Sequence, residues 1–372
     1  MLVKRRKAFS LLTILLLCIL ACNVFPDQIP TNTPRPTLTR PSKSQDFHSV
    51  TETPLPSSST EIDQTQELPP LYLSIIIHTE EDVSEGSQTK PFIPDYDGNQ
   101  VVMLHFSNTL RAFAEMAHQH GAKINFGSDW TFSKGVETFD PAFYTDLERL
   151  GHEIDAHAHE SFVPYHQVRA HIIQAGGHPS TVASGMNERA IQEKLVYFTD
   201  QYPDFLILWG VSLPGHGAGE CVASWVWRPA QENWEQHNPD GKFIFIGPGD
   251  QVNSLDSIAE AIQNRRLDRV NTYAVFLSPR SLKAAPDVEG IPETWTTKPT
   301  AFDYWENRLL WWDDFLSEID GWVEEGKVAY ATLTEIGQIF QESESGLNFE
   351  GNKCPRSEEG LLARNRAAGY RP

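Results

Sequence analysis

Histidine and carboxylate residues are concentrated at two points of this sequence, each at the end of an apolar, strand-like run. Glu80 and Glu81 closely follow the run at 71–78, and His157 and His159 lie at and just beyond the end of a later run. On an extended backbone, residues two apart point to the same side, so His157 and His159 can direct two imidazoles at one ion. Imidazole and carboxylate ligands suit Zn²⁺ or a similar divalent metal. Together the two points predict a metal site rather than a solvated acidic loop.

Alternating strands and helices are expected to position these residues. Apolar runs predict strands at 71–78, 122–127, 152–157, 205–209, 222–227, 242–246, 272–277 and 328–331. Helical periodicity and helix-ending residues predict helices at 109–120, 140–150, 165–175, 187–199, 254–267 and 302–325. This alternation favours an α/β fold with a mainly parallel sheet, either a barrel or a doubly wound sheet. In both, functional residues gather at the C-terminal ends of the strands, where the two points lie.

Three motifs carry a resemblance to a known family. Glu80-Glu81 stands where polysaccharide deacetylases of the NodB-homology type (carbohydrate esterase family 4) have a strand-end Asp-Asp pair. The GHEI segment at 151–154, followed by His157, is similar to their GHEI-x-x-H segment, and Arg228 with the next proline is similar to a later Arg-Pro. The resemblance covers residues 71–341. It implies a single domain at 69–345 with the distorted (β/α) barrel of the glycoside hydrolase/deacetylase type.

The resemblance also implies a role for each of these residues. Glu80 would be the catalytic base and Arg228 would hold it ionised, while Glu81, His157 and His159 would bind the metal. The implied cofactor is a divalent metal, with zinc as the expected ion. The implied substrate is an extracellular polysaccharide or oligosaccharide, from which water removes acyl groups.

The sequence departs from the family pattern at several positions. Its two acids are Glu rather than Asp, and Ser161 stands where the second metal-binding His usually falls. His159 or the more distant His166 must therefore substitute. Ser278 stands where a late strand normally ends in a catalytic His, and a hydroxyl cannot replace an imidazole as an acid. The general acid is unassigned, because His216 in a Gly-rich loop is better interpreted as a turn residue.

Two other functions stay open. His-x-His also begins the metal sites of amidohydrolase- and PHP-type hydrolases, although there it usually lies on the first strand and here it lies on the third. The other alternative is a non-catalytic carbohydrate-binding surface lipoprotein on the same scaffold. Metal content would separate this alternative from the two hydrolases, and product analysis would separate the hydrolases from each other.

The N-terminal segment predicts export and a lipid anchor. Residues 4–7 are basic and residues 8–21 almost wholly apolar, a run that is short for a permanent bilayer span but typical of a signal peptide at 1–21. The run ends in Ile-Leu-Ala-Cys, which is similar to a lipobox and implies a lipid on Cys22; an ordinary signal peptide or an uncleaved anchor is the alternative. We therefore expect an extracytoplasmic, membrane-anchored protein at the cell surface.

A Pro/Thr/Ser-rich tether is expected at 22–68, between the signal peptide and the domain. Residues 23–70 include 9 Pro and 14 Ser or Thr, a composition that cannot bury enough apolar surface to offset the entropy of ordering. Proline keeps such a segment extended, so it acts as a semi-stiff spacer. A polar tail is expected at 346–372.

Charge and cysteine content restrict the partners and the compartment. A formal net charge of −20 makes nucleic acid a poor partner. Two of the four cysteines lie at or before residue 22, which leaves Cys221 and Cys354. In an oxidising compartment these two are expected to form a disulfide; two unpaired thiols are the alternative.

Overall fold

The computed structural model describes residues 67–79, 95–158, 163–185, 202–210, 226–232, 236–247, 254–277, 282 and 308–347. All of them belong to one compact unit, Gln64–Pro372. The predicted signal peptide, most of the tether and nearly all of the tail lie outside the described residues. The predicted helix at 187–199 also lies outside them.

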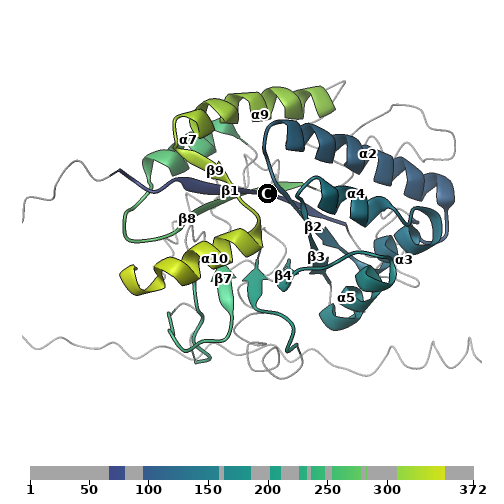
Figure 1. The fold of residues 1–372 in the computed structure, drawn as a ribbon, viewed down its shortest axis with the longest axis horizontal. Helices are drawn as coiled ribbons and strands as arrows, with labels where there is room; N and C mark the ends of the chain where they lie inside the picture. The colour runs from purple at the N-terminus through teal and green to yellow at the C-terminus, as the bar shows by residue number, and fades with distance from the viewer. Residues whose placement is uncertain are drawn as a thin grey trace, which may run out of the picture. The chain divides into compact units, whose positions relative to one another are not determined.

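Strands and helices alternate along parts of the described chain (Figure 1). The strands are β1 (Leu71–His78), β2 (Ile124–Ser128), β3 (Glu153–His157), β4 (Val182–Ser184), β5 (Ile207–Trp209), β6 (Val226–Trp227), β7 (Ile244–Ile246), β8 (Asn271–Leu277) and β9 (Val328–Tyr330). The helices are α2 (Gln100–Gln119), α3 (Trp130–Phe139), α4 (Phe143–Arg149), α5 (Tyr165–Gln174), α7 (Leu255–Gln263), α9 (Arg308–Glu324) and α10 (Leu333–Ser343), followed by a short 3-10 turn at Glu344–Gly346. The strand predicted at 71–78 has the observed bounds. The helix α3, the strand β4 and the helix α10 were not predicted.

The strands form one sheet in the order β6-β7-β5-β4-β3-β2-β1-β8, and β9 also pairs with β1. Every pairing is parallel except that of β6 with β7, which is antiparallel. The prediction of a mainly parallel sheet is therefore confirmed. The C-terminal ends of β1 to β5, β7 and β8 lie at one edge of the sheet, and the end of β6 lies at the opposite edge.

The sheet curls so far that side chains from distant strands touch. The rings of Trp209 in β5 and Phe276 in β8 stack with centroids 6.1 Å apart. Four strands separate β5 from β8 in the sheet, and strands about 4.8 Å apart would place these two roughly 24 Å apart in a flat sheet. Contact across the interior therefore requires a strongly curved sheet, and the chain has the predicted distorted (β/α) barrel.

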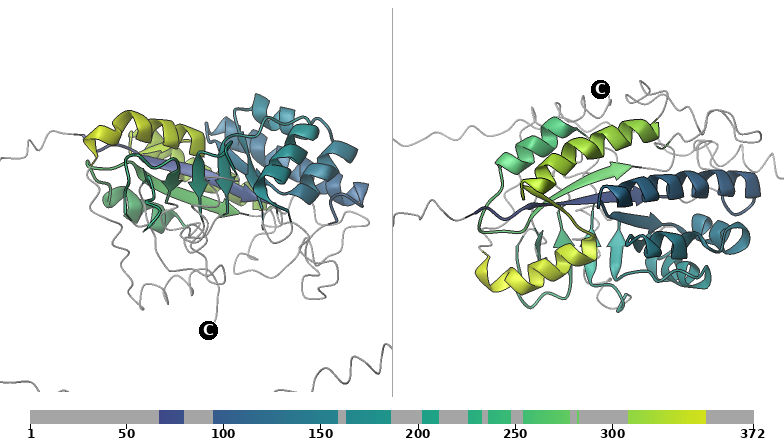
Figure 2. Two further views of the ribbon diagram at one scale, coloured as in Figure 1. Left: turned by 90° about the horizontal axis from the view of Figure 1, so that it is seen from below. Right: turned by 45° about the horizontal axis from the view of Figure 1, so that its top comes forward.

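Alternate residues of the strands face two separate apolar cores. In β1, Leu71, Leu73, Ile75 and Ile77 belong to the outer core, which the sheet shares with helices α2, α3, α4, α5, α7 and α9. Ile76 belongs to the inner core. Figure 1 shows α2 and α9 on one side of β1 and α10 on the other, and the right-hand view of Figure 2 also places α9 and α10 on opposite sides of the strand.

Helix α10 fills the N-terminal end of the barrel interior. Leu333, Ile336 and Phe340 of this helix belong to the inner core, together with residues of β4, β5 and β7. A Cβ at Gly337 would lie 2.7 Å from Cδ1 of Ile207, so the helix backbone packs directly against β5. The backbone N–H of Leu333 also donates to Oδ1 of Asn125 in β2, at 3.0 Å. These contacts fix α10 against the N-terminal end of the barrel.

Candidate functional site

His157 ends β3 at the C-terminal edge of the barrel and is buried. Its Nδ1 lies 3.1 Å from the backbone oxygen of Ser184 at the end of β4. A carbonyl can only accept, so Nδ1 carries the hydrogen, and in the neutral ring the lone pair is on Nε2. This is the tautomer in which a histidine binds a metal while a backbone carbonyl fixes its orientation.

His78 ends β1 and packs face to face with His157, which the sequence analysis did not anticipate. The two ring centroids are 4.0 Å apart and the planes are inclined by 17°. Nε2 of His78 makes a short hydrogen bond with Oγ of Ser184. Because the two rings are nearly parallel, their lone pairs do not converge on one point. In this arrangement His78 is a neighbour of His157 and not a second ligand to the same ion.

Gly127 of β2 allows these groups to come close together. A Cβ at this position would lie 2.5 Å from Cδ2 of His78, 2.8 Å from Oγ of Ser184 and 3.0 Å from Oδ1 of Asp155. Atoms cannot approach a real Cβ so closely, and any side chain here would displace them. The site therefore needs glycine at this position for space.

Asp155 comes two residues before His157 in β3, so both side chains point to the same inner face of the strand. The Asp155 side chain is completely buried. Burial and, to a lesser extent, the charge of Glu153 raise the pKa of Asp155 to about 8. The side chains of Ser184 and Asn125 oppose this rise. At neutral pH the carboxyl group is therefore mostly protonated.

Glu153, at the start of β3, has a structural role at the other edge of the barrel. Its Oε2 accepts from the backbone N–H of Thr334 at 3.2 Å, near the start of α10. Burial raises the pKa of Glu153, and its hydrogen bonds with Thr332, Ser180 and Thr334 oppose the rise. A carboxylate at a helix N-terminus satisfies otherwise unpaired N–H groups, so Glu153 attaches α10 to the barrel.

The end of β1 lies at the same edge as His157. Thr79, the first residue after β1, donates its backbone N–H to the oxygen of Gly127 at 3.1 Å. Its hydroxyl oxygen accepts from the backbone N–H of Asp129 at 2.8 Å. The predicted base Glu80 and the predicted ligand Glu81 follow directly but lie outside the described residues, as does His159. Within the described ranges, no group of three or more His, Cys, Asp or Glu side chains is arranged to hold a metal.

Arg228 does not lie with the other predicted site residues. Strand β6 is antiparallel to β7, so its end, and with it Arg228, is at the N-terminal edge of the barrel. The Arg228 guanidinium contacts Glu344 through Nε at 2.9 Å and donates from Nη1 to the oxygen of Gly241 at 2.9 Å. The family resemblance implied a pairing of Arg228 with Glu80, which lies outside the described residues; the structure instead shows Arg228 in an ion pair with Glu344.

Two further histidines noted in the sequence lie away from the candidate site. His166 is exposed on α5, and its ring lies 5.6 Å from that of Tyr202. His152 accepts from the backbone N–H of Ile124 at 3.2 Å and contacts the oxygen of Ala114 at 2.9 Å, which joins β2 to α2. Burial lowers the pKa of His152 to about 4, so the ring is neutral and structural.

Several other sequence predictions fall outside the described residues. They concern the lipid-bearing Cys22, the disulfide between Cys221 and Cys354, and the positions Ser278 and His216. Among the helices that the structure describes, none combines the length and the apolar character that a membrane span requires.

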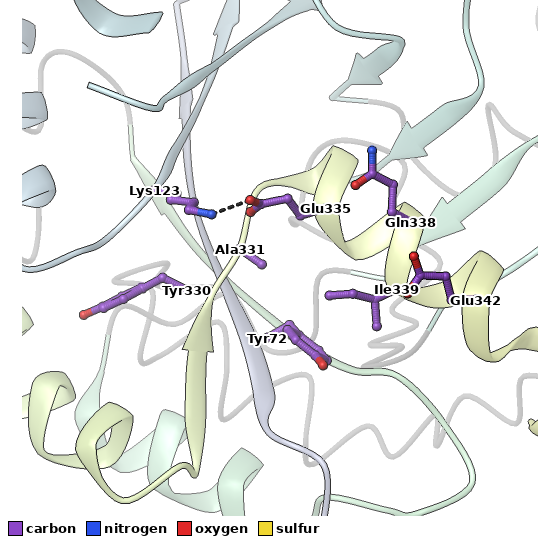
Figure 3. A pocket seen from close by; sticks show the side chains of 8 residues that line it. All are labelled: Tyr72, Lys123, Tyr330, Ala331, Glu335, Gln338, Ile339 and Glu342. Carbon is purple, nitrogen blue, oxygen red and sulfur yellow. Dashed lines mark hydrogen bonds and ion pairs between the residues drawn. The ribbon is translucent and has the colours of Figure 1, made fainter. Parts of the chain in front are cut away.

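A hollow of about 300 Å³ lies at the opposite edge, beside α10 (Figure 3). It is lined by Tyr72 of β1, Tyr330 of β9 and residues of α10, and Lys123 forms an ion pair with Glu335 at its side. Tyr72 is the second residue of β1, whereas His78 is the last. This hollow is therefore separate from the candidate site.

No protein-family model matches this chain, and no characterised protein matches it in sequence. Among solved structures, a protein assigned to the polysaccharide deacetylases from Mycobacterium smegmatis is 12% identical with a TM-score of 0.41, over 78% of this chain and 100% of the other. Puue allantoinase is 12% identical with a TM-score of 0.45, over 78% and 99%. The Bc1960 peptidoglycan N-acetylglucosamine deacetylase is 11% identical with a TM-score of 0.35, over 73% and 89%. All three similarities have TM-scores below 0.5 and identities of 12% or less.

Proposed function

We propose that this chain is an extracytoplasmic, metal-dependent hydrolase that removes acyl groups from a polysaccharide. The observation that carries the proposal is the hydrogen bond from Nδ1 of His157 to the Ser184 carbonyl, at 3.1 Å. It leaves Nε2 as the ring nitrogen able to bind a metal, at the edge of the barrel where Glu80 and Glu81 follow β1. The three motifs of the sequence supply the reaction class.

The chemistry of the donor set fits a divalent metal such as zinc. His157 would hold it with Glu81 and His159, and both kinds of donor atom are usual for zinc. When bound, such an ion lowers the pKa of a coordinated water and polarises a carbonyl group. Glu80 accepts the proton of the attacking water as the general base. Arg228 has no part in this assignment, because it pairs with Glu344.

The cellular location in the proposal rests on the sequence before the domain. A signal peptide, a lipid on Cys22 and an extended tether would hold the barrel outside the membrane that anchors it. A polysaccharide is a substrate that such a position makes accessible. The acidic net charge of −20 also agrees with a neutral or cationic glycan better than with a polyanion.

Metal content and acetate release test the proposal together. The wild-type protein should contain one divalent ion per chain and release acetate from an acetylated glycan. His157→Ala should lose both properties, because two remaining protein ligands hold a divalent ion poorly. His166→Ala is the matched control, since that histidine is exposed on α5. Equal metal content in wild type and His157→Ala would contradict the ligand assignment, and metal without acyl release would favour the amidohydrolase-type alternative.

A further inference from the structure

The indole N–H of Trp209 is a buried hydrogen-bond donor for which the described residues provide no acceptor. Trp209 ends β5 and its side chain is completely buried. Within the part of the chain that the structure describes, Nε1 has no hydrogen-bond partner. Buried polar groups in folded proteins are nearly always paired, and each exception calls for an explanation, such as a ligand that is not present.

Trp209 lies directly beside the candidate site. It pairs in register with Ser184, the residue that contacts both His157 and His78. Its ring meets the ring of His78 edge to face, with centroids 5.4 Å apart, and stacks on Phe276 at 6.1 Å. The donor is therefore at the edge of the barrel where the proposed reaction takes place.

The described side chains against the Trp209 ring are themselves rings, those of His78 and Phe276. Phe276 has no polar atom, and Nε2 of His78 is engaged by the hydroxyl of Ser184. The backbone oxygen of Trp209 itself accepts from Gly185 at 3.0 Å, so the main chain here is satisfied and only the indole lacks a partner. A tryptophan N–H can donate but cannot accept. The missing partner must carry an acceptor, which in a glycan is an oxygen atom.

We propose that the indole N–H of Trp209 binds the substrate by donating to one of its oxygen atoms, either the acyl carbonyl or a sugar hydroxyl. This inference rests on the function proposed above and names a substrate-binding residue for it. A site with an unpaired buried donor discriminates against any ligand that lacks the matching acceptor. Trp209 would therefore contribute to selectivity and to affinity.

Trp130 provides a matched control. Its indole N–H also has no partner among the described residues. However, Trp130 begins α3 in the outer layer, is partly exposed, and has the Lys134 ammonium 4.3 Å from its ring centroid. It packs against the outer core. Replacing either tryptophan by phenylalanine removes an N–H and keeps an aromatic ring.

The experiment compares Trp209→Phe and Trp130→Phe with wild type, using the full chain loaded with metal. The probes are an N-acetylated chito-oligosaccharide and the same oligosaccharide without acetyl groups. For Trp209→Phe we expect weaker binding of the acetylated probe by about threefold to tenfold, the usual range for one neutral hydrogen bond. The thermal midpoint should fall, because phenylalanine leaves a cavity at this completely buried position, so affinity is measured on the folded protein. Trp130→Phe should bind as wild type does.

The two probes also identify the acceptor. If Trp209→Phe weakens binding of the acetylated probe alone, the acceptor is the acyl carbonyl; if it weakens both, the acceptor is a hydroxyl. Unchanged binding of both probes would overturn the inference while leaving the proposed function standing. A wild-type protein that neither binds nor deacetylates the acetylated probe would overturn the proposed function and this inference with it.

Discussion

Replacing Gly185 with alanine tests whether the position of His157 depends on the close approach of the β4 backbone. Gly185 has a φ of +91°, a conformation that residues with a side chain rarely adopt. A Cβ at this position would lie 2.4 Å from Nδ1 of His157 and 2.5 Å from its Cε1. The ring would have to move, and its hydrogen bond to the Ser184 carbonyl would be lost.

Gly176 is a control that separates the cost of the backbone conformation from the cost of crowding the His157 ring. Gly176 has nearly the same backbone conformation, with a φ of +88°, but a Cβ there would have no atom closer than 3.9 Å. For Gly176→Ala we expect only the backbone penalty, about 1–2 kcal/mol. Gly185→Ala adds overpacking against His157, about 1–3 kcal/mol more, so the total loss of stability should be about 2–5 kcal/mol.

Urea unfolding of the wild type and both variants measures these losses as free energies of unfolding. Equal destabilisation by the two substitutions would show that the β4 backbone does not confine the His157 ring, and it would refute the reasoning. Metal content of the folded fraction gives a second readout. Gly185→Ala should reduce it, because the ring that carries the Nε2 donor is displaced, and Gly176→Ala should leave it unchanged.

Three further predictions concern other parts of the chain. His120 at the end of α2 contacts Asp320 at 2.7 Å and Asp313 at 3.0 Å on α9; burial alone would lower the pKa of His120, but these hydrogen bonds outweigh it and raise the pKa. The stability that the protonated His120 ring contributes should therefore be complete below about pH 6.5 and be lost as the pH rises through the raised pKa of His120. The free energies of unfolding of wild type and His120→Gln should converge at alkaline pH. Glu80→Gln should keep its metal but slow acyl release by about 10²–10⁴-fold, as expected for loss of a general base, and loss of the metal would mean that Glu80 is a ligand. Cys22→Ser should move the protein from the membrane fraction to the soluble fraction; a variant that stays membrane-bound would point to an uncleaved anchor.

The elements that the sequence predicted well are those with long, regular patterns. The run at 71–78 is apolar throughout because both faces of β1 are buried, and its bounds were correct. The strand β4 has only three residues, Val182–Ser184, which is too short for a periodic pattern. Helix α10 was missed although its capping box, Thr332 with Glu335, is a signal that the sequence contains.

The candidate site was predictable only in part. The His-x-His pattern identified His157, and the structure places it at the expected edge. His78 was overlooked because its closeness to His157 depends on the curl of the sheet, which no local pattern encodes. Arg228 was assigned to the site by its resemblance to a family motif, and that short motif gives no indication that β6 is antiparallel to β7.

The pairing partners of β1 have a consequence for how a newly made chain folds. Strand β1 is the first strand of the described chain, yet it pairs with β8 and β9, which begin at Asn271 and Val328, two hundred residues or more after the start of β1. Contacts between residues so distant in sequence form slowly, because the loop they close must first be ordered. Strand β2 can pair with one side of β1 early, but until residues 271–330 emerge the other side of LYLSIIIH is an open, apolar strand edge, the kind of segment that associates with copies of itself. We therefore expect the nascent chain to need a holding chaperone over this interval, and a truncation before β8 to aggregate rather than to fold in part.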